Sequence, residues 1–118
     1  MTRFYGVPIN AMEKMGRRKS IRFAPRAEED LVEISIYYLR KASAEAADRI
    51  VRGIYDAAVR LGEYPHIGRD RYDIRPGLYS LNVHPYLILY RFDSHRIQIS
   101  RVLHQKRNVR RIICGEKM

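Results

Sequence analysis

The first clear pattern of apolar and polar residues in the chain has the period of an α-helix. Apolar side chains recur at spacings of four, three and four residues, so they share one face. These side chains are Ala27, Leu31, Ile34 and Tyr38. Pro25 suits the first helical position, where its missing N–H costs no hydrogen bond, and residues 28–30 are acids that the helix dipole favours in a first turn. The pattern predicts a helix from Pro25 to about Lys41.

A second helical pattern follows after only a few residues. Ser43 is suited to cap it, and Glu45 lies in its first turn. Its expected buried stripe consists of Ala47, Ile50, Val51, Ile54, Ala58 and Leu61. Gly62 and Pro65 bound its end. Because the link is so short, the two helices are expected to form an antiparallel hairpin.

From Leu78 the apolar period changes to two, which is typical of β-strands. The expected strands are residues 20–24, 78–83, 86–92 and 96–100. The polar segment 65–77, with two glycines and two prolines, is expected to be a loop. The alternation fails at Arg101 and Val102, which indicates a bulge or a strand end. Residues 107–113 fit a short helix or a strand equally well.

The predicted order is therefore β-α-α-β-β-β, an α+β domain in which a helical hairpin packs on one face of a small antiparallel sheet. The 118 residues are enough for one domain. We expect the folded unit to be residues 20–113, preceded by an extension over 1–19 that folding does not need and followed by a tail over 114–118.

The distribution of charge indicates an anionic partner. The net charge is +10, and all of the excess lies near the two ends. Residues 1–23 carry a net +5 and residues 94–118 a net +6, whereas the seventy residues between them carry a net −1. Nucleic acid or an acidic protein would match such ends, and a solvated charged surface is the alternative.

Composition excludes several classes of protein. The single cysteine, Cys114, cannot form an internal disulfide, and the four histidines lack metal-ligand spacing. We therefore expect no metal, no cofactor and a reducing compartment, the cytoplasm. No apolar stretch is long enough to cross a bilayer, and we expect no membrane association.

One group of residues has a composition that suits catalysis. His104 lies among Arg101, Lys106, Arg107, Arg110 and Arg111. A metal-independent ribonuclease needs a base to activate the ribose 2′-OH and arginines to stabilise the phosphorane charge. The alternative is that His104 ends a strand while the arginines face solvent. The acids of the first helix are explained by its dipole, and several of the nine tyrosines fit core positions.

The ordered segments together resemble a known family. They are IRFAPRAEEDLVEISIYYL, the end of the second helix LGEYPHIGR, then RPGLYSLNVHPYLILYRFD and IQISRVLHQKRN. The chain resembles the ParE branch of the ParE/RelE superfamily, the plasmid-stabilisation toxins of bacterial toxin–antitoxin modules, over roughly residues 20–113. No single motif is diagnostic, but the set in this order is fairly specific.

The resemblance implies one of two activities. RelE-like members resemble ribosome-dependent mRNA endonucleases, whereas ParE-like members inhibit DNA gyrase without catalysis. RelE-type sequences commonly have an arginine after the tyrosine that opens the central strand, and here Leu87 follows Tyr86. A leucine cannot donate to a phosphorane, so we expect a stoichiometric gyrase inhibitor rather than an enzyme. The alternatives are a ribonuclease using Arg101, His104 and Arg75, and a basic nucleic-acid-binding domain.

The resemblance also implies partners and their sites. A small antitoxin, with a DNA-binding N-terminal domain and a wrapping C-terminal segment, is expected to hold the toxin inactive in a hetero-oligomer. Its expected contacts are Leu31, Ile34, Tyr37, Tyr38, Tyr55 and Tyr86. The expected target-facing residues are Lys106, Arg107, Arg110 and Arg111. In the family fold the first strand lies beside the last, so the two basic ends of the chain are expected to merge on one side.

Overall fold

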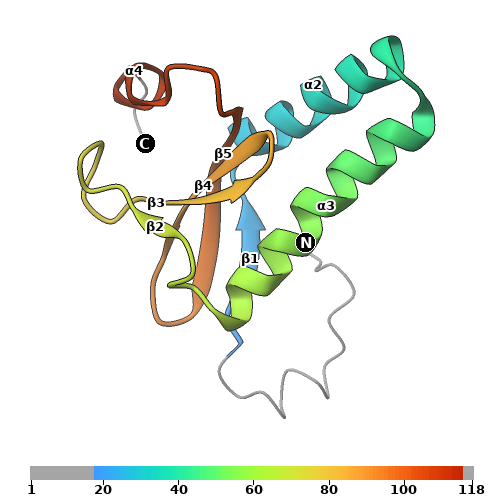
Figure 1. The fold of residues 1–118 in the computed structure, drawn as a ribbon. Helices are drawn as coiled ribbons and strands as arrows, with labels where there is room; N and C mark the ends of the chain where they lie inside the picture. Colours follow the sequence, from blue (N-terminus) through green and yellow to red (C-terminus); the bar gives the residue numbers. More distant parts are fainter. Residues whose placement is uncertain (1–17, 116–118) are drawn as a thin grey trace.

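A computed structural model describes residues 18–115 of the chain (Figure 1). The elements are β1 (Ser20–Phe23), α2 (Pro25–Lys41), α3 (Ala44–Glu63), β2 (Arg69–Asp70), β3 (Tyr79–Val83), β4 (Tyr86–Phe92), β5 (Arg96–His104) and α4 (Val109–Cys114). The predicted α+β architecture is confirmed: α2 and α3 form a hairpin against one face of the sheet. The predicted extension and tail lie almost wholly outside the described residues.

Both long helices form for the reasons that their sequences suggest. Pro25 opens α2, and Arg40 and Lys41 lie in its last turn, where the dipole favours cations. The hydroxyl oxygen of Ser43 accepts a hydrogen bond from the Ala46 N–H at 3.0 Å and so caps α3 as predicted. Within the predicted stripe of α3, Ile50 and Val51 are only half-buried, and the remaining members are buried.

The sheet is mixed, which corrects the purely antiparallel sheet that we expected. Its strand order is β1-β5-β4-β3-β2. β1 lies parallel to β5, with Ser20 opposite Arg96 and Phe23 opposite Ile99, and the other strand pairs are antiparallel. The helical hairpin carries the chain back over the sheet between β1 and the later strands, and such a crossover permits a parallel pair. β2, inside the expected loop, was also not predicted.

The break in the alternation of β5 is a β-bulge and not a strand end. Leu89 lies opposite Arg101, but Tyr90 lies opposite Ile99, so Ser100 is the extra residue. β5 then continues to His104. Because of the bulge, the alternation of β5 side chains between the two faces of the sheet is shifted by one residue beyond Ile99. This shift positions Arg101.

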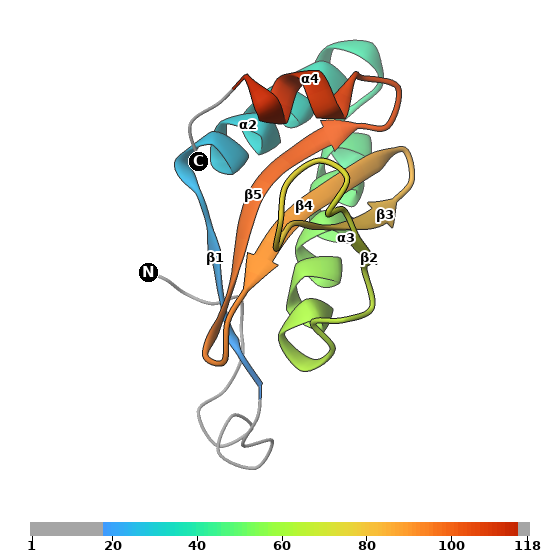
Figure 2. The same ribbon diagram turned by 90° about the vertical axis from the view of Figure 1, so that its left-hand side faces the viewer.

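The two faces of the sheet are covered by different elements. The hairpin covers one face over the main core, which includes Ile54, Leu61, Ile88, Tyr90 and Ile97. On the other face α4 covers a smaller cluster made of Leu78, Leu89, Leu103, Val109 and Ile113. Figure 2 shows α4 crossing one end of this second face, while β1 and the neighbouring part of β5 run beyond it.

Candidate functional site

A buried ion pair joins α2 to β5 where β1 has already ended. The last hydrogen bond of β1 to β5 runs from the Ala24 N–H to the Ile99 carbonyl oxygen, at 2.9 Å. Further along β5, Asp30 Oδ2 accepts the Val102 N–H at 2.9 Å. The carboxylate of α2 therefore replaces the missing strand as a hydrogen-bond partner for β5.

Arg101 completes this contact. Its Nε donates to Asp30 Oδ2 at 2.8 Å and its Nη2 to Asp30 Oδ1 at 3.0 Å, a bidentate pair. The two side chains are only 3% and 6% exposed. A guanidinium held in this way is directed into the protein, so the Arg101 charge is balanced by Asp30 and is not presented to an incoming phosphate.

The other two residues proposed for ribonuclease chemistry also make structural contacts. His104 Nδ1 accepts the Lys106 N–H at 3.1 Å, and its ring packs edge-on against Tyr86 at 5.3 Å between centroids. Arg75 donates from Nη2 to the Ile113 carbonyl oxygen of α4 at 3.0 Å. The side chains of Arg101, His104 and Arg75 thus bind to α2, to the turn after β5 and to α4, respectively. These contacts hold the three side chains at different places and do not bring them together as a general acid–base site.

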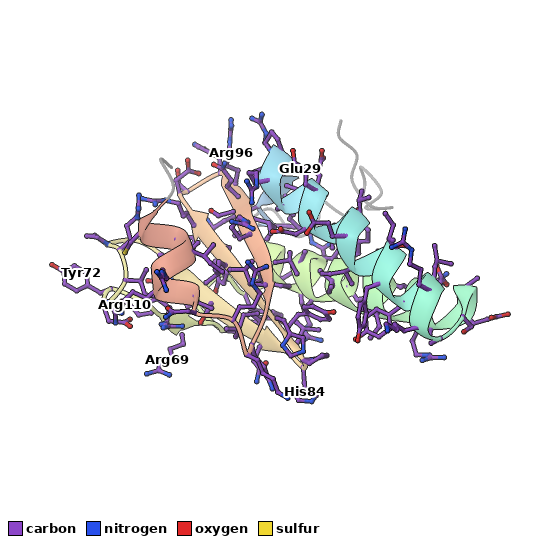
Figure 3. The ribbon with its side chains drawn as sticks, turned by 90° about the horizontal axis from the view of Figure 1, so that it is seen from above. Glu29, Arg69, Tyr72, His84, Arg96 and Arg110 are labelled. Atoms are coloured by element: carbon purple, nitrogen blue, oxygen red, sulfur yellow. The ribbon has the colours of Figure 1, made fainter. Side chains whose placement is uncertain are left out.

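The basic residues after β5 lie in the turn before α4 and on α4 itself. All four residues expected to face the target are exposed. Arg110 makes two hydrogen bonds to Asp73. The Nη1 of Arg110 donates to the Asp73 backbone oxygen at 2.5 Å, and its Nη2 donates to the Asp73 carboxylate oxygen Oδ2 at 3.1 Å. Arg71 also donates to Asp73. This bond and the Arg71 charge, with the Arg110 charge as the smallest contribution, lower the Asp73 pKa below its usual value. Figure 3 shows Arg110 and Tyr72 projecting on the side of the molecule away from the hairpin.

Among residues 18–115, the cations of the first basic end lie beside the start of β5 and do not reach those that follow it, which corrects that part of the expectation. β1 does lie beside β5 as expected. However, Lys19 donates to the Ser94 carbonyl oxygen at 3.1 Å, before β5 begins, whereas Lys106 and Arg107 follow its last residue. The nine residues of β5 therefore separate them, roughly 25–30 Å of extended chain. Arg18 pairs with Glu63 of α3, and Arg101 with Asp30.

A groove of about 480 Å³ runs between α2 and α3 on the hairpin. It is lined by Glu28, Leu31, Val32, Ser35, Leu39, Ala44, Ala47, Asp48, Val51 and Tyr55. The lining is mainly apolar, and its two charged residues are both acidic. A groove with this lining suits an amphipathic segment with apolar anchors.

The residues expected to contact an antitoxin differ in their access to this groove. Leu31, Ile34 and Tyr86 are buried in the core of the chain itself, although Leu31 also lines the groove. Tyr38 and Tyr55 are half-buried. Tyr37, at 53% exposure, is the most open of the six.

Three exposed apolar residues of α2 were not predicted from the sequence. Val32, Ile36 and Leu39 are 57%, 41% and 51% exposed, and with Tyr37 they form an unburied apolar stripe. They follow one another at spacings of four and three, the same helical signal that identified the buried face. A helix with two apolar stripes, one of them unused by the fold, was therefore readable from the sequence.

Within residues 18–115, no group of three or more histidine, cysteine or acidic side chains is placed to hold a metal ion. In the same part of the chain, no helix is long and apolar enough to span a bilayer.

Comparisons with known proteins find toxins of the ParE and RelE types. The family model described as ParE toxin of type II toxin-antitoxin system, parDE, matches residues 21–109. Toxin ParE3 of Caulobacter vibrioides is 42% identical over 50 residues, 42% of this chain and 50% of that relative, so the match spans half its length. Toxin RelE3 of the same organism is 32% identical over 87 residues, 73% of this chain and 94% of the relative.

A solved structure has the same fold. The structure titled "Chromosomal ParDE TA system from P. aeruginosa" has a TM-score of 0.66 and 24% identity, covering 75% of this chain and 97% of that chain.

A double-mutant cycle tests the structural role of the buried pair. Asp30→Asn keeps an acceptor for the Val102 N–H but leaves the Arg101 charge buried without a counter-charge, so we expect the free energy of unfolding to fall by about 3 kcal/mol. Arg101→Met should cost a similar amount. Because the double variant buries neither charge, its loss should be smaller than the summed single losses by at least about 1 kcal/mol in urea unfolding.

The exposed pair Arg52–Asp48, with side chains 69% and 64% exposed, is the matched control. The same substitutions there, Arg52→Met and Asp48→Asn, should each change stability by less than about 0.5 kcal/mol. Additive losses at Asp30 and Arg101 would contradict the structural role assigned to the pair.

Proposed function

Since the chain belongs to the ParE toxin family of type II toxin–antitoxin systems, we propose that it is a stoichiometric inhibitor of DNA gyrase that a cognate antitoxin holds inactive. An inhibitor of this kind acts by occupying a surface of its target, so it needs complementary shape and charge but no acid–base pair.

The buried ion pair is the observation that favours inhibition over catalysis. A ribonuclease of the type weighed above needs an arginine that can reach the developing phosphorane charge. Arg101 is instead bound to Asp30 through two hydrogen bonds at 3% exposure. Leu87, in the position where RelE-type sequences carry an arginine, packs against the apolar cluster under α4. At these two positions, Arg101 and Leu87, the side chains are therefore used for packing and are not available as cations for a phosphate.

The groove between α2 and α3 supports the antitoxin part of the proposal. Val32 and Leu39 of the exposed stripe line it, and Tyr55 closes it from α3. An apolar helical stripe that its own fold leaves open is a typical docking site for an amphipathic helix. The related structure named after a ParDE system agrees with such a partner.

The basic surface after β5 supports contact with the target. Lys106, Arg107 and Arg111 are exposed, and the described residues provide no ion-pair partner for them. Arg110 shares Asp73 with Arg71 and so offers less free charge. We infer that the first three residues face the target, with Arg110 fixing α4 against the loop before β3.

The likeness to Toxin RelE3 keeps mRNA cleavage as the second candidate function. Parallel assays of the purified chain separate the two. We expect inhibition of gyrase supercoiling and no ribosome-dependent mRNA cleavage. His104→Gln, which removes the candidate base, should leave gyrase inhibition within about twofold of the unaltered chain. Cleavage of mRNA that is lost in His104→Gln would contradict the proposal.

Exposed substitutions in the groove test antitoxin binding. Val32→Glu with Leu39→Glu places two charges in the apolar lining without touching the core. We expect affinity for the proposed cognate antitoxin to fall on the order of 100-fold in a titration, since buried apolar anchors dominate such interfaces.

Asn82→Glu with Ser94→Glu adds the same charge at exposed positions outside the groove and is the control. It should bind with unchanged affinity. Equal weakening by both pairs would place the docking site elsewhere.

A further inference from the structure

The face of the sheet away from the hairpin has an uncovered part that carries arginines. Along β1 and β5, buried and exposed residues alternate, so Arg22, Arg96 and Gln98 point away from the hairpin core. Arg22 and Arg91 lie on either side of Gln98 in the strand register. Figure 2 shows these strands running beyond α4 on this face. We name Arg22, Arg91, Arg96 and Gln98 the open face.

No carboxylate interrupts the open face within the strands. β1, β3, β4 and β5 contain four arginines and no aspartate or glutamate, and only Arg101 of the four is tied to an acid of the hairpin. Arg22 and Arg96 are exposed, and Arg91 is half-buried with a long contact, 3.5 Å, to the Pro76 carbonyl oxygen. The strands of the open face therefore carry net positive charge. Asp93, in the turn before β5, accepts the Arg96 N–H at 2.9 Å, and the backbone N–H groups of His95 and Arg96, with a smaller contribution from the Arg96 charge, lower the Asp93 pKa.

The spacing of the cations suits a repeating anion. Neighbouring strands lie about 4.8 Å apart, so the Cα atoms of Arg22 and Arg91, one on each side of Gln98, lie roughly 10 Å from each other. Arg96 lies two residues before Gln98 on the same strand, about 7 Å away. Long arginine side chains spread over such distances can each meet a separate phosphate of a nucleic-acid backbone.

The residue types on the open face help to decide which kind of polyanion it suits: an acidic protein, a single-stranded nucleic acid or a duplex. Interfaces with proteins, acidic ones included, have a core of apolar anchors. Among the described residues, none of the large exposed apolar side chains lies on β1, β4 or β5. Binding of single strands relies on aromatic platforms, but Phe23, Tyr90 and Phe92 pack on the hairpin side of the sheet. Of the polyanions considered, the phosphate backbone of a duplex therefore fits this face best.

We propose that the open face binds the phosphate backbone of double-stranded DNA without reading its sequence. It lies on the opposite side of the sheet from the hairpin that forms the antitoxin groove, so a segment in the groove leaves it uncovered. The proposal goes beyond gyrase inhibition and does not depend on it, since DNA binding is a property of the chain alone.

Fluorescence anisotropy of the full chain with a labelled duplex of about 20 base pairs tests this proposal. We expect a Kd on the order of 10 μM at about 50 mM NaCl, weakening steeply with added salt. Arg22→Gln with Arg96→Gln should weaken binding about tenfold or more at that salt. It should also reduce the slope of log K against log salt by about 1.8, because each phosphate contact contributes about 0.9.

Arg49→Gln with Arg60→Gln is the matched control, since it removes the same charge from exposed positions on α3. The affinity of this control for the duplex should stay within about twofold of that of the unaltered chain. Its slope of log K against log salt should stay within about 0.3. Three results would overturn the proposal: equal weakening by both double variants, no binding at low salt, or tighter binding of single-stranded RNA of the same length. The assay contains no gyrase, so its failure is separate from a failure of the gyrase proposal.

Discussion

The bidentate contact between Asp30 and Arg101 is the interaction on which the rest of the structure depends. β1 supports β5 only as far as Ile99, and beyond that point the backbone of β5 needs another partner. Asp30 supplies it by accepting both the Val102 N–H and the Arg101 guanidinium. The bulge at Ser100 makes this possible, since it changes the side-chain pattern of β5 at that position. The contact between Asp30 and Arg101 thus fixes α2 of the hairpin against β5. It also supplies the hydrogen bonds that β5 needs beyond Ile99.

This arrangement favours binding over catalysis. With Arg101 buried and His104 holding the turn after β5, the end of the sheet that could resemble a nuclease centre is used for structure. The functions that we propose rest instead on surfaces of different character. The hairpin offers an apolar groove whose charged lining residues are acids, whereas the two basic surfaces used in the proposals lie on the sheet face and around α4. Partners of opposite chemistry can therefore approach one small domain from different sides.

The elements that depend on local pattern were predictable. Periodicity identified α2, α3 and the last three strands, and the Ser43 cap followed from the residue type alone. The parallel pairing of β1 was missed because strand direction in a sheet depends on the path of the connecting chain. The partner of Asp30 was missed because it lies 71 residues away, and no local rule distinguishes it from a dipole-favoured acid. The open stripe of α2 was readable, but periodicity alone does not say which of two apolar stripes is buried.

Under the proposed function, the chain inhibits gyrase by occupying a surface of it and not by catalytic turnover. A titration of purified toxin against a fixed concentration of gyrase measures this most directly. Loss of supercoiling should reach its end point at a fixed molar ratio of toxin to gyrase, unchanged by longer incubation. Progressive and complete inactivation by toxin far below that ratio would show turnover and would contradict the account.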